Sequence, residues 1–140
     1  MGDYTGLRVD VVLKPEFVPV IKYLMSDERR YAEDPYACEP AWEAVAGKFP
    51  QYAFLRHWSM VPRADFIPFG ALAYMPWDDA DPAWQHRLEG DRWVFQCSLK
   101  NYDQTIETFL KDVLSLMAKE VNEVYHLYEY NDQPTYWNGK

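Results

Sequence analysis

The segment Arg92 to Lys100 restricts the fold of this chain more than any other feature of its sequence. One set of its residues is apolar and alternates with a mixed set: Trp93, Phe95, Cys97 and Leu99 against Arg92, Val94, Gln96, Ser98 and Lys100. A period of two places the two sets on opposite faces of a β-strand. The sequence therefore predicts that the fold contains a β-sheet, and that the face carrying Trp93, Phe95, Cys97 and Leu99 packs against the core.

Three other segments have the pattern of strands. Leu7 to Leu13 alternates as well, and Val12 on its second face predicts a strand that is partly buried on both sides, as a central strand is. Phe66 to Tyr74 is predicted to be an edge strand, because Pro68 cannot donate a hydrogen bond to a neighbouring strand. Val124 to Tyr130 is predicted to be the last strand.

Three segments have apolar residues at helical spacing, namely Pro15 to Met25, Pro40 to Phe49 and Ile106 to Met117. Pro15 suits a first helical position, whereas Pro19 predicts an irregular first turn or a later start. Asn101 or Asp103 can cap the last helix. Gln51 to Trp58 fits either a short helix or coil.

The element order is strand, helix, helix, strand, strand, helix, strand. At 140 residues the chain has the size of a single domain. We therefore expect an α+β fold with one antiparallel or mixed four-stranded sheet and helices on one face, of the ferredoxin-like kind. In that topology the strands at Leu7 to Leu13 and Arg92 to Lys100 are central.

Charge is distributed unevenly along the chain. The net charge is −8, from 22 acidic and 14 basic residues. Residues 26–43 hold six acids against two arginines, and residues 76–91 hold five acids against one arginine, which together account for the imbalance. We expect two acidic loops, 26–39 and 76–91, and a tail over 131–140. This pattern argues against nucleic-acid binding, which needs excess Lys and Arg, and favours a basic partner surface.

The candidate partner-binding residues lie in these two acidic segments: Trp77, Asp78, Asp79, Asp81 and Trp84 in the second, with Glu33 and Asp34 in the first. Carboxylates attract a basic surface, and tryptophans are frequent anchors of interfaces. Two alternatives remain. The acids can form a solvated loop, since this segment lacks the glycine and glutamate of a calcium loop. Both indoles can cover the edge of the helix layer.

No grouping of residues in the sequence predicts catalysis or a cofactor. His57, His86 and His126 are far from one another and from both cysteines, and no phosphate loop or nucleophile elbow is present. Acidic neighbours disfavour the thiolate of Cys38, and Cys97 fits a core position. We expect no enzyme, no catalytic residue, no metal and no cofactor.

Cellular location is predicted from what the sequence lacks. No apolar stretch approaches the roughly 18 residues of a membrane-spanning helix, and the first residues do not resemble a secretory signal. Two cysteines do not suggest a disulfide framework. A cytoplasmic protein with reduced thiols and no membrane contact is expected.

The last third of the chain contains a strand running into a capped helix. It comprises Phe95 to Asp103, followed by Ile106, Phe109-Leu110 and Pro134-Thr135. This stretch resembles a group of small uncharacterised phage and bacterial proteins. The resemblance implies a cytoplasmic accessory protein carried by a phage or prophage, and it assigns no functional residues.

The leading hypothesis is a small acidic protein-interaction module that binds or inhibits a host factor, or neutralises a toxin, through a basic surface of that partner. One alternative is a small-molecule-binding or enzymatic domain with an aromatic pocket of Tyr125, Tyr128, Tyr130 and Trp137. A third hypothesis is a self-associating structural protein, a homodimer paired through its last strand or the Pro68 edge.

Overall fold

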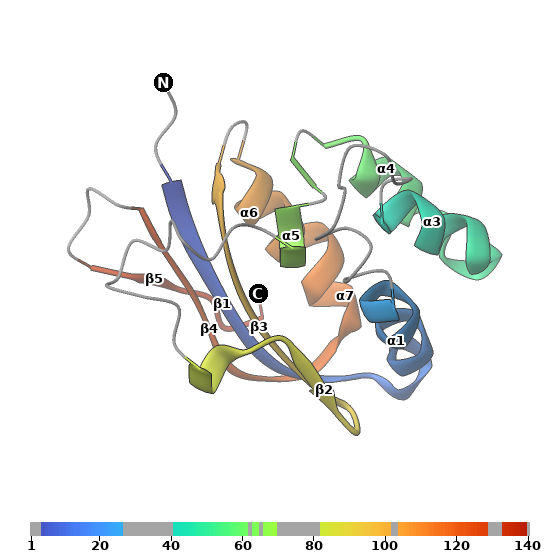
Figure 1. Cartoon of the computed structure of the whole chain (residues 1–140), viewed down its shortest axis with the longest axis horizontal. Helices are drawn as coiled ribbons and strands as arrows, with labels where there is room; N and C mark the ends of the chain where they lie inside the picture. Colours follow the sequence, from blue (N-terminus) through green and yellow to red (C-terminus); the bar gives the residue numbers. More distant parts are fainter. Residues whose placement is uncertain are drawn as a thin grey trace.

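A computed structural model describes residues 4–26, 41–61, 63–64, 66–69, 82–101, 104–128 and 133–139. Within this part, five strands form an antiparallel sheet in the order β2-β3-β1-β4-β5. The helices gather on one side of the sheet, to its right in Figure 1. The α+β class is therefore confirmed, whereas the sheet has five strands and not the four that the sequence predicts.

The two alternating segments form inner strands, as predicted. β1 (Tyr4–Leu13) pairs with β3 (Arg92–Lys100) from Tyr4↔Lys100 to Val12↔Arg92. On its other side, β1 pairs with β4 (Ala118–Tyr128). The predicted inward-facing side chains are all buried in the core: Leu7, Val9, Val11 and Leu13 from β1, and Trp93, Phe95, Cys97 and Leu99 from β3.

The first helix has the irregular start that its two prolines predict. A 3₁₀ turn, η1 (Pro15–Phe17), precedes α1 (Val18–Ser26). Pro15 lies at the beginning of this turn, where a missing backbone N–H leaves no helical bond unmade. α1 then buries Val20, Ile21 and Leu24 against the rest of the core.

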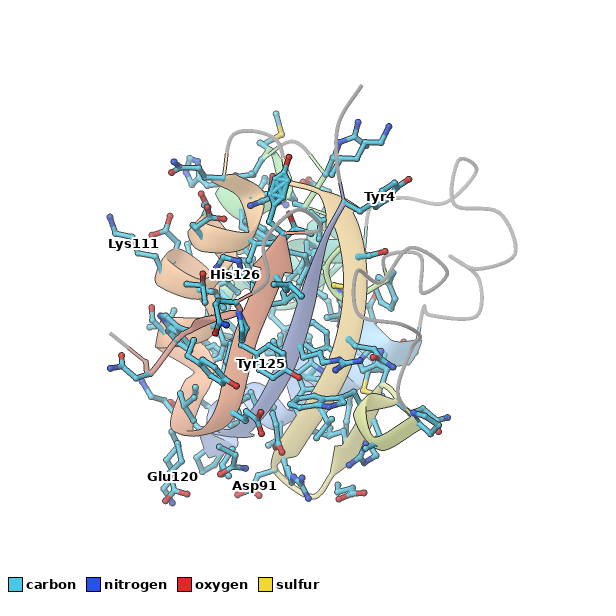
Figure 2. All side chains as sticks on the ribbon, turned by 90° about the vertical axis from the view of Figure 1, so that its left-hand side faces the viewer. Tyr4, Asp91, Lys111, Glu120, Tyr125 and His126 are labelled. Carbon is cyan, nitrogen blue, oxygen red and sulfur yellow. The ribbon has the colours of Figure 1, made fainter. Side chains whose placement is uncertain are left out.

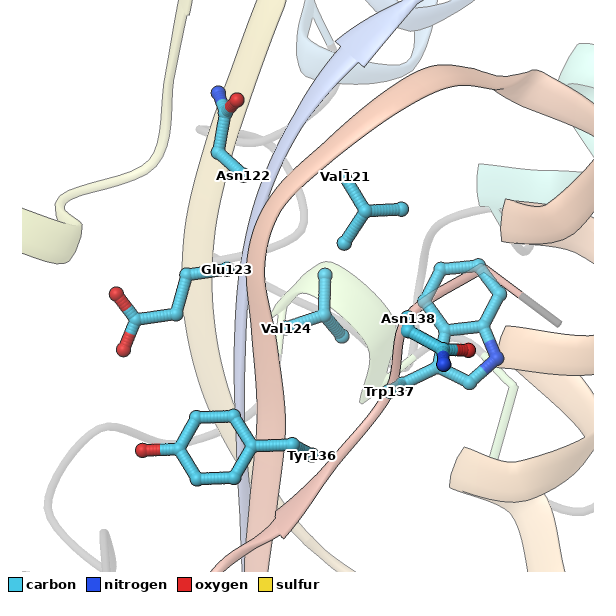
Figure 3. Close-up of a pocket in the computed structure, with 7 residues that line it drawn as sticks. All are labelled: Val121, Asn122, Glu123, Val124, Tyr136, Trp137 and Asn138. Atoms are coloured by element: carbon cyan, nitrogen blue, oxygen red, sulfur yellow. The ribbon is translucent and has the colours of Figure 1, made fainter.

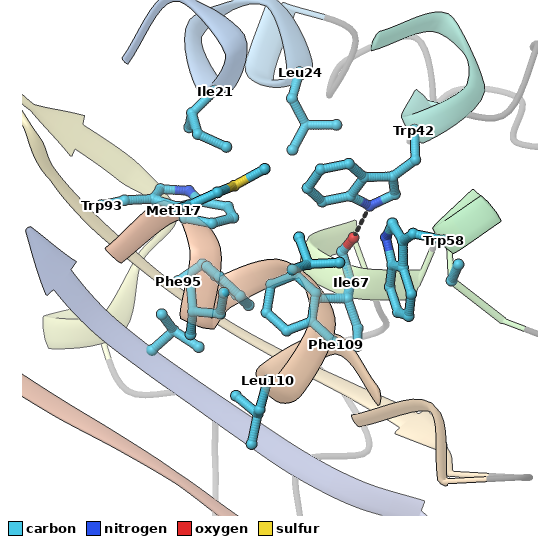
Figure 4. Close-up of a cluster of buried hydrophobic side chains, with 14 of the residues drawn as sticks. Ile21, Leu24, Trp42, Trp58, Ile67, Trp93, Phe95, Phe109, Leu110 and Met117 are labelled. Carbon is cyan, nitrogen blue, oxygen red and sulfur yellow. Dashed lines mark hydrogen bonds between the residues drawn. The ribbon is translucent and has the colours of Figure 1, made fainter. Parts of the chain in front are cut away.

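The middle of the chain folds into short helices: α3 (Ala41–Lys48), η2 (Pro50–Tyr52), α4 (Leu55–Ser59) and the kinked α5 (Phe66–Phe69). Aromatic rings join them to the last helical segment, as Figure 4 shows. The ring of Trp42 lies 6.3 Å from that of Trp58 and 6.2 Å from that of Phe109, measured between centroids. Trp42 also donates its indole N–H to the Ile67 carbonyl at 2.6 Å, which connects α3 to α5.

The last helical segment follows β3 and consists of α6 (Thr105–Thr108), the π-helical η6 (Phe109–Leu114) and α7 (Ser115–Met117). Asn101 caps it: the side-chain oxygen accepts the Ile106 N–H at 2.7 Å, and the amide donates to Glu107 at 2.6 Å. The predicted apolar stripe is buried, comprising Ile106, Phe109, Leu110, Val113, Leu114 and Met117. Asp103, the other predicted cap, lies outside the described residues.

The predicted edge strand over Phe66–Tyr74 is wrong for its described residues, 66–69, which form α5. Ile67 is buried and its carbonyl accepts the Trp42 indole, so this segment packs among the helices and does not join the sheet. The edge beside β3 is instead β2 (Arg87–Glu89), a three-residue strand within the predicted acidic loop 76–91. Residues 70–74 lie outside the described part.

The last strand is longer than predicted and has a short partner. β4 begins at Ala118 rather than Val124, and its pairing with β1 shifts register twice, between Asp10 and Val11 and between Val12 and Leu13. β5 (Thr135–Tyr136) lies in the predicted tail and pairs with β4 opposite Tyr125 and His126. Of the predicted acidic loop 26–39, only Ser26, the last residue of α1, is described.

None of the helices among the described residues combines the length and the apolar character that a bilayer crossing requires.

Candidate functional site

One of the seven predicted partner-binding residues lies in the described part of the chain. Trp84 is the last residue of η4 (Pro82–Trp84), a short 3₁₀ turn. The other six lie outside the described residues: Glu33, Asp34, Trp77, Asp78, Asp79 and Asp81. The surroundings of Trp84 are therefore where the predicted site can be built from contacts.

Trp84 packs on the sheet face opposite the helices. Its ring lies 5.7 Å from that of Tyr125, edge to face, and 5.8 Å from the Arg8 guanidinium carbon. Arg8 alternates with the buried Leu7 and Val9 and pairs with Tyr125, so both side chains project away from the helix layer. Figure 2 views this face, with Tyr125 labelled. The alternative that Trp84 covers the edge of the helix layer is wrong.

Arg8 is the charged centre of this face. Only 7% of the residue is exposed. Its guanidinium donates to the Gln96 side-chain oxygen at 3.3 Å and to the Tyr125 hydroxyl at 3.1 Å. These bonds and the Trp84 ring offset the cost of removing a permanent positive charge from water. Arg8 thereby fixes the position of the two aromatic side chains above the sheet.

Three aromatic side chains form a continuous row across this face, which we call the aromatic row: Trp84, Tyr125 and Tyr136. Tyr136, on β5, lies directly opposite Tyr125, on β4, and their ring centroids are 5.2 Å apart. Tyr136 is 66% exposed, one of the few large hydrophobic residues of the described part that reach the solvent. The row thus runs from a partly buried end at Trp84 to an exposed end at Tyr136.

An open groove of about 550 Å³ lies at the exposed end of the aromatic row, between β4 and the residues that follow β5. Its lining residues are drawn in Figure 3: Val121, Asn122, Glu123, Val124, Tyr136, Trp137 and Asn138. The backbone N–H of Trp137 donates to the backbone carbonyl of Val124 at 2.9 Å and holds the two segments together. Val121, Val124 and Trp137 pack toward the core on the helix-facing side of β4, whereas Glu123 supplies a carboxylate on the opposite side.

Glu123 and Tyr136 project to the same side of the groove in Figure 3. The register shift between Asp10 and Val11 explains the position of Glu123, because Asn122 is the extra residue between the pairs Val11↔Val121 and Asp10↔Glu123. Glu123 is exposed, and among the described residues it has no hydrogen-bond or ion-pair partner. The groove therefore presents an uncompensated carboxylate beside an exposed aromatic ring.

Asp10 lies on the same sheet face and is engaged by its neighbours. Arg92 donates two hydrogen bonds to its carboxylate, at 2.9 and 2.8 Å, and Asn122 donates a third at 3.1 Å. The Arg92 bonds hold the pKa of Asp10 below its ordinary value of 3.8, against the opposing effect of partial burial. The hydrogen bonds from Arg92 on β3 and Asn122 on β4 to Asp10 on β1 connect the three strands. The carboxylate of Asp10 is therefore already engaged.

The three histidines lie in different places and serve no common site. His57 is exposed on α4. His86 accepts the indole N–H of Trp93 at its Nε2 atom, at 3.0 Å, and its ring contacts that of Phe95. His126 lies on β4, where burial lowers its pKa and Glu107 opposes the shift. Among the residues that the structure describes, no three His, Cys, Asp or Glu side chains gather as a metal site would require.

The prediction that Cys97 is a core residue is confirmed, because the residue is fully buried. Cys38 lies outside the described residues. The aromatic pocket of the small-molecule hypothesis is not assembled from its described members, because Tyr125 pairs with Arg8 and Tyr128 pairs with Thr5. These partners lie three residues apart on β1 and so on opposite faces of the sheet. Tyr130, a further member, is not described.

Sequence reasoning missed Arg8, Glu123 and Tyr136 as parts of one surface. The face on which Arg8 lies could be predicted from the sequence, since Arg8 alternates with the apolar residues of a predicted central strand. The pairing of β4 with β5 could not be predicted, because a strand of two residues has no periodicity.

Comparison with known proteins adds no relative to this description: no protein-family model, curated protein or solved structure matches the chain.

Proposed function

We propose that this chain is a non-enzymatic protein-interaction module whose acidic segments bind a basic surface of a partner protein. The observation that supports it best is the separation of charge along the chain. The described residues contain nine acids and eleven bases, whereas the remaining residues contain thirteen acids and three bases. The surplus negative charge therefore belongs to segments outside the described sheet and helices. Such segments accelerate association with a surface of opposite sign.

Two acids within the predicted acidic segments have structural partners and are less available to a partner protein. Glu43 accepts from Arg56 and from Ser59, both at 3.0 Å, which joins α3 to α4. Glu89 accepts from Arg87 at 2.8 Å. The acids proposed for partner binding remain Glu33, Asp34, Asp78, Asp79 and Asp81. Trp84 anchors the second segment to the sheet through its ring contacts with Arg8 and Tyr125.

The partner we propose is a host or cognate protein with a basic surface, and in a phage setting the module would inhibit that protein. Cytoplasmic action belongs to the same proposal. We also infer a ferredoxin-like arrangement for the first four strands, with β5 as an addition. The support is the order β2-β3-β1-β4, in which β1 is antiparallel to both neighbours.

Affinity capture from host lysate tests the proposal with two variants of equal charge change. The first neutralises the second acidic segment by Asp78→Asn, Asp79→Asn and Asp81→Asn. The control neutralises three exposed acids elsewhere, by Glu16→Gln, Asp112→Asn and Glu120→Gln. Because the proposed attraction is local to the segment, the wild-type chain and the control should retain the same basic protein. The segment variant should lose most of it, and salt of about 0.3 M should weaken all binding.

Mass spectrometry of the captured proteins identifies the partner and its charge. Equal recovery by all three proteins, or recovery of nothing above empty resin, contradicts the proposal.

Self-association stays a separate hypothesis that light scattering can test. Pairing through a Pro68 edge is no longer its route, since Pro68 lies within α5.

A further inference from the structure

The outer side of the groove beside β5 combines two features that suit a positively charged side chain. Tyr136 offers an exposed ring, and Glu123 offers a carboxylate without an ion-pair partner in the described part, both on the sheet face opposite the helices. We propose that this groove takes the side chain of an arginine or lysine from an extended basic segment of the partner protein. The inference rests on the proposed function and assigns a location to it.

The chemistry of each wall matches a different part of such a side chain. A guanidinium or ammonium group is attracted to the face of an aromatic ring, and a carboxylate adds a charge-assisted hydrogen bond. The aliphatic stem of Arg or Lys packs along apolar surface while its charge stays near water. The ring of Tyr136, which packs on that of Tyr125, provides this surface on the outer face of the sheet, and the open side leaves the charged end hydrated.

The aromatic row gives a reason for a peptide segment rather than an isolated cation. It continues from Tyr136 through Tyr125 to Trp84, with ring centroids 5.2 and 5.7 Å apart. Trp84 closes η4, which directly follows Asp81 in the chain. A basic segment lying along the row would place one cationic side chain in the groove and direct others toward the acids that precede η4.

A second copy of this chain is a poorer occupant. Each copy carries a net charge of −8, so two copies repel each other over the distance at which charges act in solution. The groove itself adds the unpaired carboxylate of Glu123 to that repulsion. A partner segment rich in Arg or Lys relieves both, and charge complementarity therefore selects it.

The test measures binding of the full chain to a ten-residue peptide of alternating arginine and serine, with a citrulline version of the same peptide as the neutral control. Two variants change the groove, Glu123→Gln and Tyr136→Leu. Two matched controls change an exposed acid on the same strand and an exposed ring elsewhere, Glu120→Gln and Phe54→Leu. Titration calorimetry at about 0.05 M salt gives the Kd, and circular dichroism verifies that each variant is folded.

Each groove variant should raise the Kd for the arginine peptide about threefold to fivefold, because each removes one contact of the exposed cation–π or ion-pair kind. The two controls should change it by less than about 1.5-fold, and the citrulline peptide should not bind. If circular dichroism shows that Tyr136→Leu disturbs the fold, the Kd of the Glu123→Gln variant alone tests the inference.

Unchanged affinity in both groove variants overturns the inference, and so does equal binding of the citrulline peptide or no binding by the wild-type chain. A loss of peptide affinity confined to the Asp78, Asp79 and Asp81 variant also overturns it, yet leaves the proposed function standing. A groove variant that acts only by dissociating a dimer, seen by light scattering, identifies a second copy as the occupant and overturns it as well.

Discussion

At the scale of single residues, the two buried tryptophans of the helix layer differ in how their polar atoms are satisfied. The indole N–H of Trp42 donates to the Ile67 carbonyl. The indole N–H of Trp58, whose residue is 4% exposed, has no hydrogen-bond partner among the described residues. Both rings contact Phe109, so their apolar surroundings are similar. The difference between them isolates the contribution of one hydrogen bond.

Replacing each indole by a phenyl ring measures that contribution. Trp42→Phe leaves the Ile67 carbonyl without its donor, whereas Trp58→Phe removes an N–H that has no acceptor. Both changes lose similar volume, and we expect Trp42→Phe to cost about 1–2 kcal/mol more in the free energy of unfolding. Urea denaturation of the two variants measures this difference. Equal losses would show that the hydrogen bond contributes nothing net.

His126 makes stability depend on pH. Burial lowers its pKa below the ordinary value of 6.5, so the folded state favours the neutral imidazole and the unfolded state binds a proton first as the pH falls. The stabilising contribution is complete above about pH 6.5 and is lost as the pH falls toward and through the lower folded-state pKa. Urea denaturation at several pH values should show this loss in the wild-type chain.

The variant His126→Gln should lack that part of the pH dependence, since glutamine does not titrate. His57→Gln is the matched control, because His57 is exposed on α4. An unchanged pH profile in His126→Gln would assign the acid sensitivity to other groups.

At the scale of elements, long periodic segments were predictable and short or edge segments were not. β3 and most of β1 alternate because one face of each meets the helices. Phe66 to Tyr74 is apolar throughout, and such a run fits a buried helix as well as a strand. The first half of β4 contains the exposed residues Lys119, Glu120, Asn122 and Glu123, since β5 leaves most of the outer edge of β4 near water. Its register shifts also interrupt any alternation that a pattern could reveal.

The cap at Asn101 is the element-scale feature that one substitution tests best. Its oxygen accepts the Ile106 N–H and its amide reaches Glu107, so Asn101→Ala leaves a backbone donor at the start of α6 without a partner. We expect a loss of about 1 kcal/mol in the free energy of unfolding, measured by urea denaturation. Asn101→Asp keeps the acceptor and should recover most of it. Equal losses in both variants would contradict capping by the side-chain oxygen.

At the scale of the whole molecule, the charge separation could be predicted from the sequence, and the proposed binding surface could be predicted only in part. The two acidic segments, 26–39 and 76–91, are evident from the positions of acidic residues in the sequence. The aromatic row needs β4 beside β5 and η4 over β1, contacts between residues far apart in sequence, which no local pattern encodes. Trp84 was predicted as a binding residue, whereas Tyr136 and Glu123 required the paired strands to be placed.

The π-helical turn of η6 winds a segment whose apolar residues have the spacing of an ordinary α-helix. Its two inward pairs, Phe109-Leu110 and Val113-Leu114, are separated by the exposed residues Lys111 and Asp112. Residues three and four apart share one face of an ordinary α-helix, so an α-helical turn over the same six residues would bury both pairs as well. The wider winding is therefore imposed by the packing around this segment and is not encoded in the spacing of its apolar residues.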